Sequence, residues 1–292
     1  MTRIVNNCVA LVCLCLFWGQ SLRAADASHS EQIKWGNESV FNEEHNTLGL
    51  FSGVLGGQIV LAGGTSDDYS RWGRNAVCLS ENAGFALYED VLSKPLAYGA
   101  SITLSDGILC IGGRDSSQCY KDVFLVTMQQ GKLNVSEDWP PLPFPLSNAA
   151  GALLDNKVYL FGGRKSVSPS RLSDSFFVLD LSNKSRGWKE LPGYPGCVRE
   201  DAILVVQNNG VSPCLYLLGG QTETEEGLSS CLTDGYVYNP QLGKWSSLGS
   251  DFPKGICAAV ASGANHILLF QKEPEDTQRS EERRVGKECR SR

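Results

Sequence analysis

Short apolar runs alternate with polar, turn-forming segments along most of this chain. A representative unit begins with a β-rich run at residues 157–161, which ends at the pair Gly162 and Gly163. A polar loop, a second β-rich run at 174–178, and Trp188 follow in that order. Short apolar runs bounded by glycine and polar residues predict antiparallel strands joined by turns. The unit therefore predicts successive strands of one antiparallel sheet.

The same unit recurs with a period of about fifty residues. Glycine doublets stand at residues 63–64, 112–113, 162–163 and 219–220, with spacings of 49, 50 and 57. Strand-like runs precede them at 57–62, 108–111, 157–161 and 215–218, and others follow at 75–79, 122–126, 174–178 and 234–238. A diglycine with this period is typical of kelch repeats, each of which forms one four-stranded blade. We therefore predict an all-β fold of the kelch-type β-propeller class.

An outer fourth strand is expected near a tryptophan in three of the repeats. Trp139, Trp188 and Trp245 occupy this place, and the first repeat has the run 85–88 instead. A large aromatic ring at that position can fill the space between neighbouring blades. These residues are therefore predicted to lie between blades.

The repeats divide the chain into successive segments. The predicted propeller spans residues 47–270, with repeats at about 47–94, 95–143, 144–194 and 195–250, and a partial fifth at 251–270. Gln271 and Lys272 stand where the fifth doublet should be. We therefore expect four full blades and part of a fifth, out of six, and we expect the chain to be a C-terminally truncated fragment whose activity the sequence leaves open.

Both ends of the chain differ from the repeats. Residues 1–27 combine a basic start, an apolar run from Cys8 to Trp18 and a small-x-small site at 25–27, which is typical of a cleaved secretory signal peptide. This predicts a periplasmic or secreted protein with no membrane anchor in its mature form. Residues 271–292 end in a charged run with no strand pattern, and resemble translated vector sequence more than native protein.

Charge and cysteine usage narrow the function classes. The formal net charge of −6 and the absence of a basic stripe argue against binding to nucleic acid. Seven of the eleven cysteines lie between the two excluded ends. Cys110 and Cys214 stand on or beside apolar strands and are expected to be buried thiols. Export permits disulfides, and the sequence leaves open pairs such as Cys119 with Cys231 or Cys197 with Cys257.

Three strings beside the doublets carry a more specific resemblance. They lie at residues 50–64, at 95–101 with 108–113, and at 143–152. Over about residues 46–270 the chain resembles the N-acetylneuraminate epimerases, or sialic acid mutarotases, of the cyclically permuted type. The resemblance implies an exported six-bladed kelch propeller that interconverts the anomers of a sialic acid. It also implies that an N-terminal strand within 28–46, at Trp35, could close the last blade.

The implied reaction defines the groups to look for. Opening a sugar hemiketal needs one group to accept the anomeric proton and another to protonate the ring oxygen. An arginine can hold the carboxylate of the sugar acid as a bidentate pair. The propeller topology places the loops after the doublets and the loops entering the next blades on one face. The predicted substrate-binding residues on this face are Tyr98, Asn148, Arg164, Arg199 and Gln221.

The predicted catalytic residues are Arg114 and Asp115. Unpermuted epimerases look to have a glutamate directly after the second doublet, and an arginine ahead of the Ala-Tyr-Gly string. Arg114 and Leu96 occupy these positions here. Asp115, one position further along, is therefore assigned the acid–base role in place of the glutamate.

Two other functions compete with the epimerase interpretation. A non-catalytic kelch propeller could bind a glycan or a protein through the same face, because fold does not determine function. A copper oxidase on a kelch scaffold would need clustered histidine ligands, and the sequence has only His29, His45 and His266. The resemblance implies an isomerase that uses a sialic acid as substrate, without a cofactor or a metal, and the non-catalytic propeller stays open as the alternative.

Overall fold

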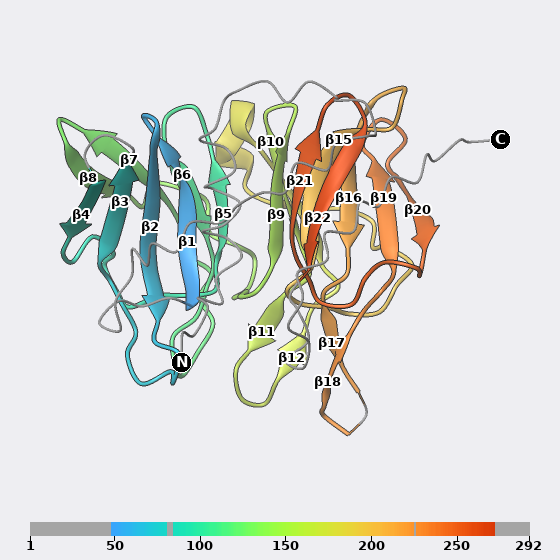
Figure 1. Ribbon diagram of the computed structural model, residues 1–292, viewed down its shortest axis with the longest axis horizontal. Helices are drawn as coiled ribbons and strands as arrows, with labels where there is room; N and C mark the ends of the chain where they lie inside the picture. Colours follow the sequence, from blue (N-terminus) through green and yellow to red (C-terminus); the bar gives the residue numbers. More distant parts are fainter. Residues whose placement is uncertain (1–47, 81–83, 225, 272–292) are drawn as a thin grey trace, which may run out of the picture.

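Antiparallel sheets account for nearly all of the secondary structure in a computed structural model, which describes residues 48–80, 84–224 and 226–271. Blade 1 consists of β1 (Leu48–Leu55), β2 (Gln58–Thr65), β3 (Ala76–Ser80) and β4 (Gly84–Tyr88), and blade 2 of β5 (Ala100–Thr103), β6 (Ile108–Ile111), β7 (Val123–Gln129) and β8 (Lys132–Ser136). Blade 3 consists of β9 (Ala150–Leu154), β10 (Lys157–Phe161), β13 (Phe176–Asp180) and β14 (Lys189–Glu190), and blade 4 of β15 (Ile203–Asn208), β16 (Pro213–Leu218), β19 (Gly235–Asn239) and β20 (Lys244–Gly249). Within the described residues a fifth sheet contains only β21 (Ile256–Ser262) and β22 (His266–Gln271). The predicted kelch-type propeller fold is confirmed, with four complete blades and one hairpin (Figure 1).

The blades are arranged side by side around their first strands. β1 contacts β5, β5 contacts β9, β9 contacts β15, and β15 contacts β21. Hydrogen bonds also join the first two blades directly, because the backbone N–H of Ser52 donates to Ser101 Oγ at 3.0 Å and that of Val54 to Thr103 Oγ1 at 3.2 Å. The first strand of each sheet is therefore the inner strand, as in a propeller.

The hydrophobic core lies between blades. Its clusters join blade 1 to blade 2, blade 2 to blade 3, and blade 3 to blade 4. Trp139 and Trp188 pack against the second of these clusters, and Trp188 Nε1 donates to the carbonyl of Pro140 at 3.0 Å. Trp245 contacts the rings of Phe161 and Phe176 of blade 3, at centroid distances of 5.9 and 5.0 Å. The predicted position of these tryptophans between blades agrees with this packing.

The glycine doublets of blades 1 to 3 connect each of these blades to the next. Gly163 has φ +92°, and its N–H donates to the carbonyl of Arg199, which leads into blade 4. A Cβ atom at Gly163 would lie 2.5 Å from the carbonyl oxygen of Ser147, and one at Gly162 would lie 2.6 Å from that of Arg199. Only glycine combines this conformation with so close an approach of two backbones. The period of the first three doublets in the sequence therefore reflects one inter-blade contact that repeats from blade to blade.

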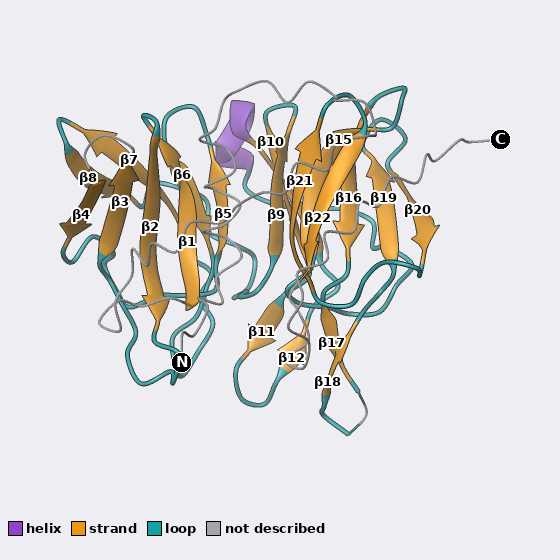
Figure 2. Cartoon of the chain, in the orientation of Figure 1, coloured by secondary structure: helices purple, strands orange, loops and turns teal. Residues whose placement is uncertain are grey.

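Two hairpins and one short helix extend from the blades. The hairpins β11–β12 (Arg164–Ser166 and Arg171–Leu172) and β17–β18 (Gln221–Glu223 and Ser229–Cys231) directly follow the doublets of blades 3 and 4. They project on the same side of the molecule, at the lower edge of Figure 1. The 3₁₀ helix η1 (Leu181–Arg186) lies at the opposite end of the blades (Figure 2). The sequence did not predict these hairpins.

Six cysteines in the described ranges are free thiols: Cys78, Cys110, Cys119, Cys197, Cys214 and Cys231. Cys110 and Cys214 are fully buried, as predicted. Neither of the possible disulfides is formed, because Cys119, Cys231 and Cys197 are free thiols. The Cys119 thiol instead lies 3.4 Å from Ser147 Oγ.

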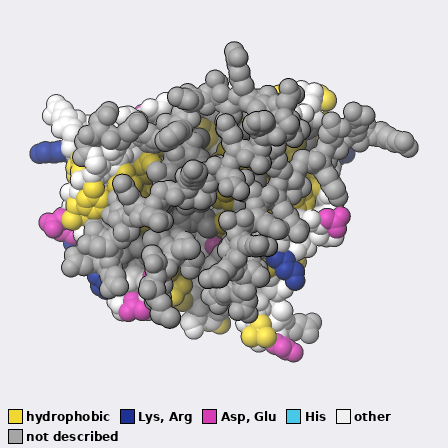
Figure 3. Space-filling view, viewed as in Figure 1, with side chains coloured by type: hydrophobic (Ala, Val, Ile, Leu, Met, Phe, Trp, Pro, Cys, Tyr) yellow, Lys and Arg dark blue, Asp and Glu magenta, His cyan; other side chains and the backbone are white. Residues whose placement is uncertain are grey.

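Several predictions fall outside the described residues. The signal peptide at 1–27, the segment 28–46 with Trp35, and residues 272–292 of the predicted tail are among them. In the part of the chain that the structure describes, no helix is long and apolar enough to cross a membrane. Basic and acidic side chains are interspersed around the visible part of the described surface (Figure 3).

Candidate functional site

Backbone hydrogen bonds link the loops that enter successive blades. The N–H of Tyr98 donates to the carbonyl of Gly49, that of Asn148 to Tyr98, and that of Asp201 to Asn148, at 2.7, 2.7 and 3.0 Å. All four residues have positive φ, between +52° and +64°. These equivalent positions lie at the start of β1 and just before β5, β9 and β15. They form what we call the inner rim, defined by Gly49, Tyr98, Asn148 and Asp201.

The residue after each doublet lies next to the inner rim. Antiparallel bridges pair Ala97 with Arg114, Ser147 with Arg164, and Glu200 with Gln221. In each bridge the first residue directly precedes a rim residue and the second directly follows a doublet. Repetition of one backbone arrangement therefore places side chains from blades 2, 3 and 4 on one face, which agrees with the topological argument from sequence.

Arg114 lies against aromatic rings. Its guanidinium carbon lies 4.7 Å from the ring centroid of Tyr98 and 5.2 Å from that of Trp72. The ring of Tyr69 stacks on that of Tyr98 at 6.5 Å, and Trp72 meets Tyr98 edge-on at 6.3 Å. Among the described residues, no carboxylate lies within ion-pair distance of Arg114. The aromatic rings hold the cation without neutralising it, so its charge remains available to a ligand.

Tyr98 is itself half-buried beneath this arrangement. A Cβ atom at Gly49 would lie 2.8 Å from the Tyr98 ring, so the ring lies directly on the glycine. Burial raises the pKa of the Tyr98 phenol far above its usual range, although Arg114 acts in the opposite direction. Tyr98 is therefore a neutral phenol at physiological pH.

Asp115, the predicted acid–base residue, is committed to its own loop. Its Oδ1 accepts hydrogen bonds from Ser117 N, Ser117 Oγ and Gln118 N at 2.7, 2.8 and 2.9 Å, and its Oδ2 accepts from the Tyr120 hydroxyl at 2.6 Å. Burial would raise the pKa of Asp115, but these hydrogen bonds outweigh it and lower the pKa to about 2. A carboxylate held in this way is a weak proton acceptor. The geometry therefore favours a structural role for Asp115 in the loop.

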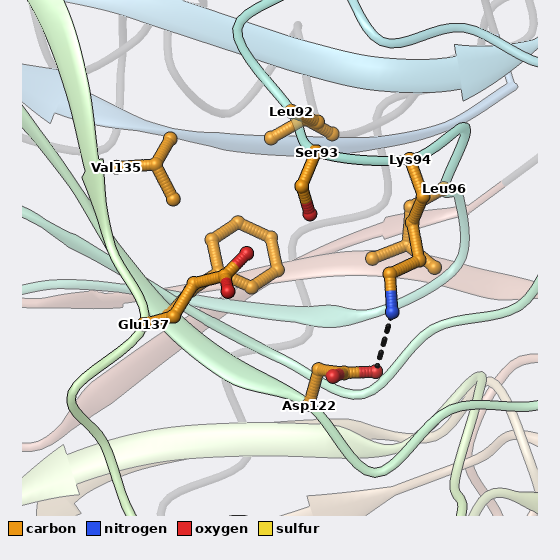
Figure 4. A pocket seen from close by; sticks show the side chains of 8 residues that line it. Leu92, Ser93, Lys94, Leu96, Asp122, Val135 and Glu137 are labelled. Carbon is orange, nitrogen blue, oxygen red and sulfur yellow. Dashed lines mark hydrogen bonds and ion pairs between the residues drawn. The ribbon is translucent and has the colours of Figure 1, made fainter.

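A small hollow lies between blades 1 and 2, close to the loop that contains Asp115. It is lined by Leu92, Ser93, Lys94, Leu96, Asp122, Phe124, Val135 and Glu137, and Figure 4 shows the ion pair of Lys94 with Asp122 at its edge. Lys94 Nζ also lies 4.5 Å from the ring centroid of Tyr120, which donates to Asp115. The volume of the hollow is about 10 Å³, which is room for about one water molecule. We therefore regard it as a packing defect and not as a ligand site.

Arg164 lies in a network that joins the two hairpins. It makes a two-pronged ion pair with Glu200, in which Arg164 Nε donates to Glu200 Oε2 at 2.9 Å and Nη2 to Oε1. Its Nη2 also lies 3.1 Å from Glu223 Oε1 of the hairpin β17–β18. Ser170, in the loop of the hairpin β11–β12, accepts a hydrogen bond from Arg164 and donates one to Glu223. Glu200 is largely buried, and it raises the pKa of Arg164. Two carboxylates therefore already neutralise the Arg164 side chain.

Arg199 is completely buried. Its Nη1 and Nη2 donate to the two carboxylate oxygens of Asp234 at 2.7 and 2.8 Å, its Nη1 donates to the carbonyl of Gly219 at 2.8 Å, and its Nε to the Tyr194 hydroxyl at 2.9 Å. Burial would lower the pKa of Arg199, but Asp234 and Tyr194 raise it. All of this side chain is used to join the entry of blade 4 to its third strand, so we expect it to support the site without contacting a ligand.

Asn148 and Gln221 both donate side-chain hydrogen bonds to Asp201, an acidic residue of the inner rim. Asn148 Nδ2 donates to Asp201 Oδ1 at 2.8 Å, and Gln221 Nε2 donates to Asp201 Oδ2 at 2.6 Å. Asp201 is exposed, and it forms no ion pair with any described lysine or arginine. The two amides therefore orient a carboxylate that faces solvent.

The structure brings together five of the seven predicted residues, and it adds others. Tyr98, Arg114, Asn148, Arg164 and Gln221 lie on or beside the inner rim, whereas Asp115 is hydrogen-bonded within its own loop and Arg199 is buried. The role of each one stays a prediction. Tyr69, Trp72 and Glu223 were missed. The two aromatic residues in the polar loop 66–74 were the available signal for the first two. Among the described residues, no group of three or more His, Cys, Asp or Glu side chains could hold a metal ion.

Comparison with known proteins shows which family this chain resembles. Residues 139–272 match the family model of the N-acetylneuraminate epimerases. The N-acetylneuraminate epimerase of Yersinia pestis (strain Pestoides F) is 30% identical over 139 residues, which cover 46% of this chain and 33% of that protein. That of Haemophilus influenzae (strain PittEE) is 31% identical over 131 residues, covering 45% of this chain and 32% of that protein. The predicted resemblance to this family is confirmed, and the matched region spans about a third of the relatives' length.

Two further relatives support the fold. A kelch domain-containing protein of Vibrio cholerae is 30% identical over 141 residues, which cover 47% of this chain and 36% of that protein. The solved structure of YjhT superimposes with a TM-score of 0.60 at 15% sequence identity, and covers 76% of each chain. At this level of identity the structural likeness supports a common kelch-propeller fold and nothing finer.

Proposed function

We propose that this chain is the propeller of a sugar mutarotase that interconverts the anomers of N-acetylneuraminate or a related sialic acid. The observation that carries the proposal is Arg114, a cation framed by aromatic rings and free of any carboxylate among the described residues. Its neighbours on the inner rim offer amide and carboxylate groups from other blades. The match of residues 139–272 to the family model of the N-acetylneuraminate epimerases supports a sialic acid as the substrate.

The proposed substrate fits the chemistry of this face. A sialic acid carries a carboxylate, for which a guanidinium is the preferred bidentate donor. The rings of Tyr69 and Trp72 beside Arg114 offer apolar faces for the sugar. Asn148 and Gln221 can exchange hydrogen bonds with its hydroxyl or N-acetyl groups. Export of the protein, predicted from residues 1–27, belongs to the proposal as well.

The alternative of a non-catalytic binder is favoured by one specific observation. Asp115, the carboxylate first assigned to proton transfer, accepts four hydrogen bonds from its own loop. A face with Arg114 and aromatic rings but without a working base would bind a sugar acid and leave its anomers unchanged.

The two functions are separated by following anomer exchange. N-acetylneuraminate enriched in one anomer is mixed with the chain, and its approach to equilibrium is recorded by ¹H NMR beside a sample with heat-denatured protein. Acceleration that rises in proportion to chain concentration supports the mutarotase. Exchange at the spontaneous rate, together with saturation-transfer signals from bound sugar, supports the binder. Exchange at the spontaneous rate with no bound sugar overturns both.

A further inference from the structure

The charged groups on the inner face differ in whether the protein already neutralises them. Arg164 is paired with Glu200 and Glu223, and Arg199 is paired with Asp234. The five charged side chains in these ion pairs neutralise one another within the protein. Arg114, Asp115 and Asp201 form no ion pair with any described residue. Asp115 is held by four hydrogen bonds from its own loop, so Arg114 and Asp201 remain as the cation and the anion beside the inner rim.

Asp201 is linked through the inner rim to Tyr98, one of the aromatic residues beside Arg114. Tyr98, whose ring lies beneath Arg114, accepts a backbone hydrogen bond from Asn148, and Asn148 accepts one from Asp201. The carboxylate of Asp201 is also close enough to Tyr98 to raise the pKa of its phenol. Asp201 therefore lies near the place where a ligand carboxylate would bind Arg114.

The two aspartates of this face differ in how much of each carboxylate is free. Asp115 accepts four hydrogen bonds from the protein, whereas Asp201 accepts two, one on each oxygen. An ionised carboxylate has about four acceptor sites, so Asp201 keeps roughly half of them for a ligand. Asn148 and Gln221 fix its orientation, as a positioned proton acceptor requires.

We infer that Asp201, and not Asp115, is the proton acceptor of this site, and the inference rests on the proposed function. Asp201 takes the proton of the anomeric hydroxyl, the bond between the anomeric carbon and the ring oxygen breaks, and its electron pair goes to the ring oxygen. A water molecule protonates that oxygen, and the resulting hydroxide recovers the proton from Asp201. The open-chain keto form then closes on its other face by the reverse transfers, so protons and electrons balance.

The inference is tested by the anomer-exchange assay on wild-type chain and on three variants. Asp201→Asn is expected to lower the catalysed rate by roughly 10²–10⁴-fold, the usual contribution of general acid–base catalysis. Asp115→Asn is expected to lower it by less than about tenfold, provided that thermal unfolding shows a folded protein. Asp122→Asn serves as the matched control, because its carboxylate pairs with Lys94 away from the rim, and it is expected to keep the wild-type rate.

Measuring how tightly the sugar acid binds separates a catalytic role of Asp201 from a structural one. Because Arg114 is retained, Asp201→Asn should bind the sugar acid within about threefold of wild type in saturation-transfer titration, while the exchange rate falls. A rate for Asp201→Asn within twofold of wild type overturns the inference and leaves the mutarotase standing. A parallel loss of binding and rate also overturns it, because Asp201 would then only shape the site. Failure of the wild-type chain to accelerate exchange overturns the proposed function, and the inference with it.

Discussion

The buried pair of Arg199 and Asp234 gives the most quantitative prediction. Arg199 is fully buried, and two of its nitrogens donate to Asp234 at 2.7 and 2.8 Å. In Asp234→Ala the guanidinium would keep the Gly219 carbonyl and the Tyr194 hydroxyl as partners, but no counter-charge. Removing one member of a buried ion pair costs about 3–5 kcal/mol, because the remaining charge stays buried. The hydroxyl of Tyr236 would also lose its acceptor, Asp234 Oδ2 at 3.0 Å.

The assay is thermal or urea unfolding monitored by tryptophan fluorescence. For a chain of this size, 1 kcal/mol corresponds to about 2–4 °C, so Tm is expected to fall by roughly 6–20 °C. Asp122→Ala is the matched control. Its pair with Lys94 has side-chain exposures of 47% and 36%, and such a surface pair contributes about 0–1 kcal/mol. Equal losses in the two variants would refute the argument that burial controls the cost.

A double variant tests the same reasoning from the opposite direction. Combining Arg199→Met with Asp234→Leu removes both charges and fills much of their volume. Replacing a whole buried pair by apolar side chains is often nearly neutral, so the double variant is expected to be more stable than Asp234→Ala. A double variant at least as unstable as Asp234→Ala would contradict the account of an uncompensated charge.

The pair also predicts a dependence of stability on pH. Burial would raise the pKa of Asp234, but Arg199 outweighs it and holds the pKa below the usual value for aspartate. A carboxyl group with a lower pKa in the folded than in the unfolded state contributes stability above its unfolded pKa, and this is lost as pH falls through the folded pKa. The stability gap between wild type and Asp234→Ala is therefore expected to be full at neutral pH and to narrow only in acid, below the usual aspartate range.

Three further predictions follow from other parts of the molecule. Gly163→Ala should destabilise the fold by about 1–3 kcal/mol in urea unfolding, because its Cβ would lie 2.5 Å from the Ser147 carbonyl oxygen at φ +92°; a neutral effect would contradict the role given to the doublets. Exposed Cys231 should react rapidly with a thiol reagent and buried Cys110, whose thiol pKa is raised by burial, only on unfolding; equal labelling rates by mass spectrometry would contradict the packing. Arg114→Met should weaken binding of N-acetylneuraminate roughly 10–100-fold in calorimetry, the value of a hydrogen bond to a charged group; unchanged affinity would remove Arg114 from the site.

The repeat and its strands were readable from sequence because they depend on local patterns. The runs predicted at 108–111 and 157–161 coincide with β6 and β10, and the partial repeat predicted at 251–270 contains β21 and all but the last residue of β22. The hairpins after two doublets were not predicted, because polar sequences there carry no apolar alternation. β17, for example, reads Gln-Thr-Glu.

Whether each charged side chain is paired or free could not be predicted from the sequence in the same way. The partner of Arg199 is Asp234, 35 residues further along, and the partner of Arg164 is Glu200, in the next blade. Which charges stay free therefore depends on contacts within a blade and between neighbouring blades, which sequence order does not reveal. Asp115 illustrates the converse, because its nearest partners are local, yet only the folded loop turns them all towards one carboxylate.

The most direct test of the account is the rate of anomer exchange of N-acetylneuraminate as a function of wild-type chain concentration. The account predicts that the rate measured by ¹H NMR rises in proportion to the concentration of the chain and saturates with sugar. It also predicts that the acceleration disappears in Asp201→Asn while the sugar still binds. Exchange at the spontaneous rate at every concentration of folded wild-type chain would contradict it.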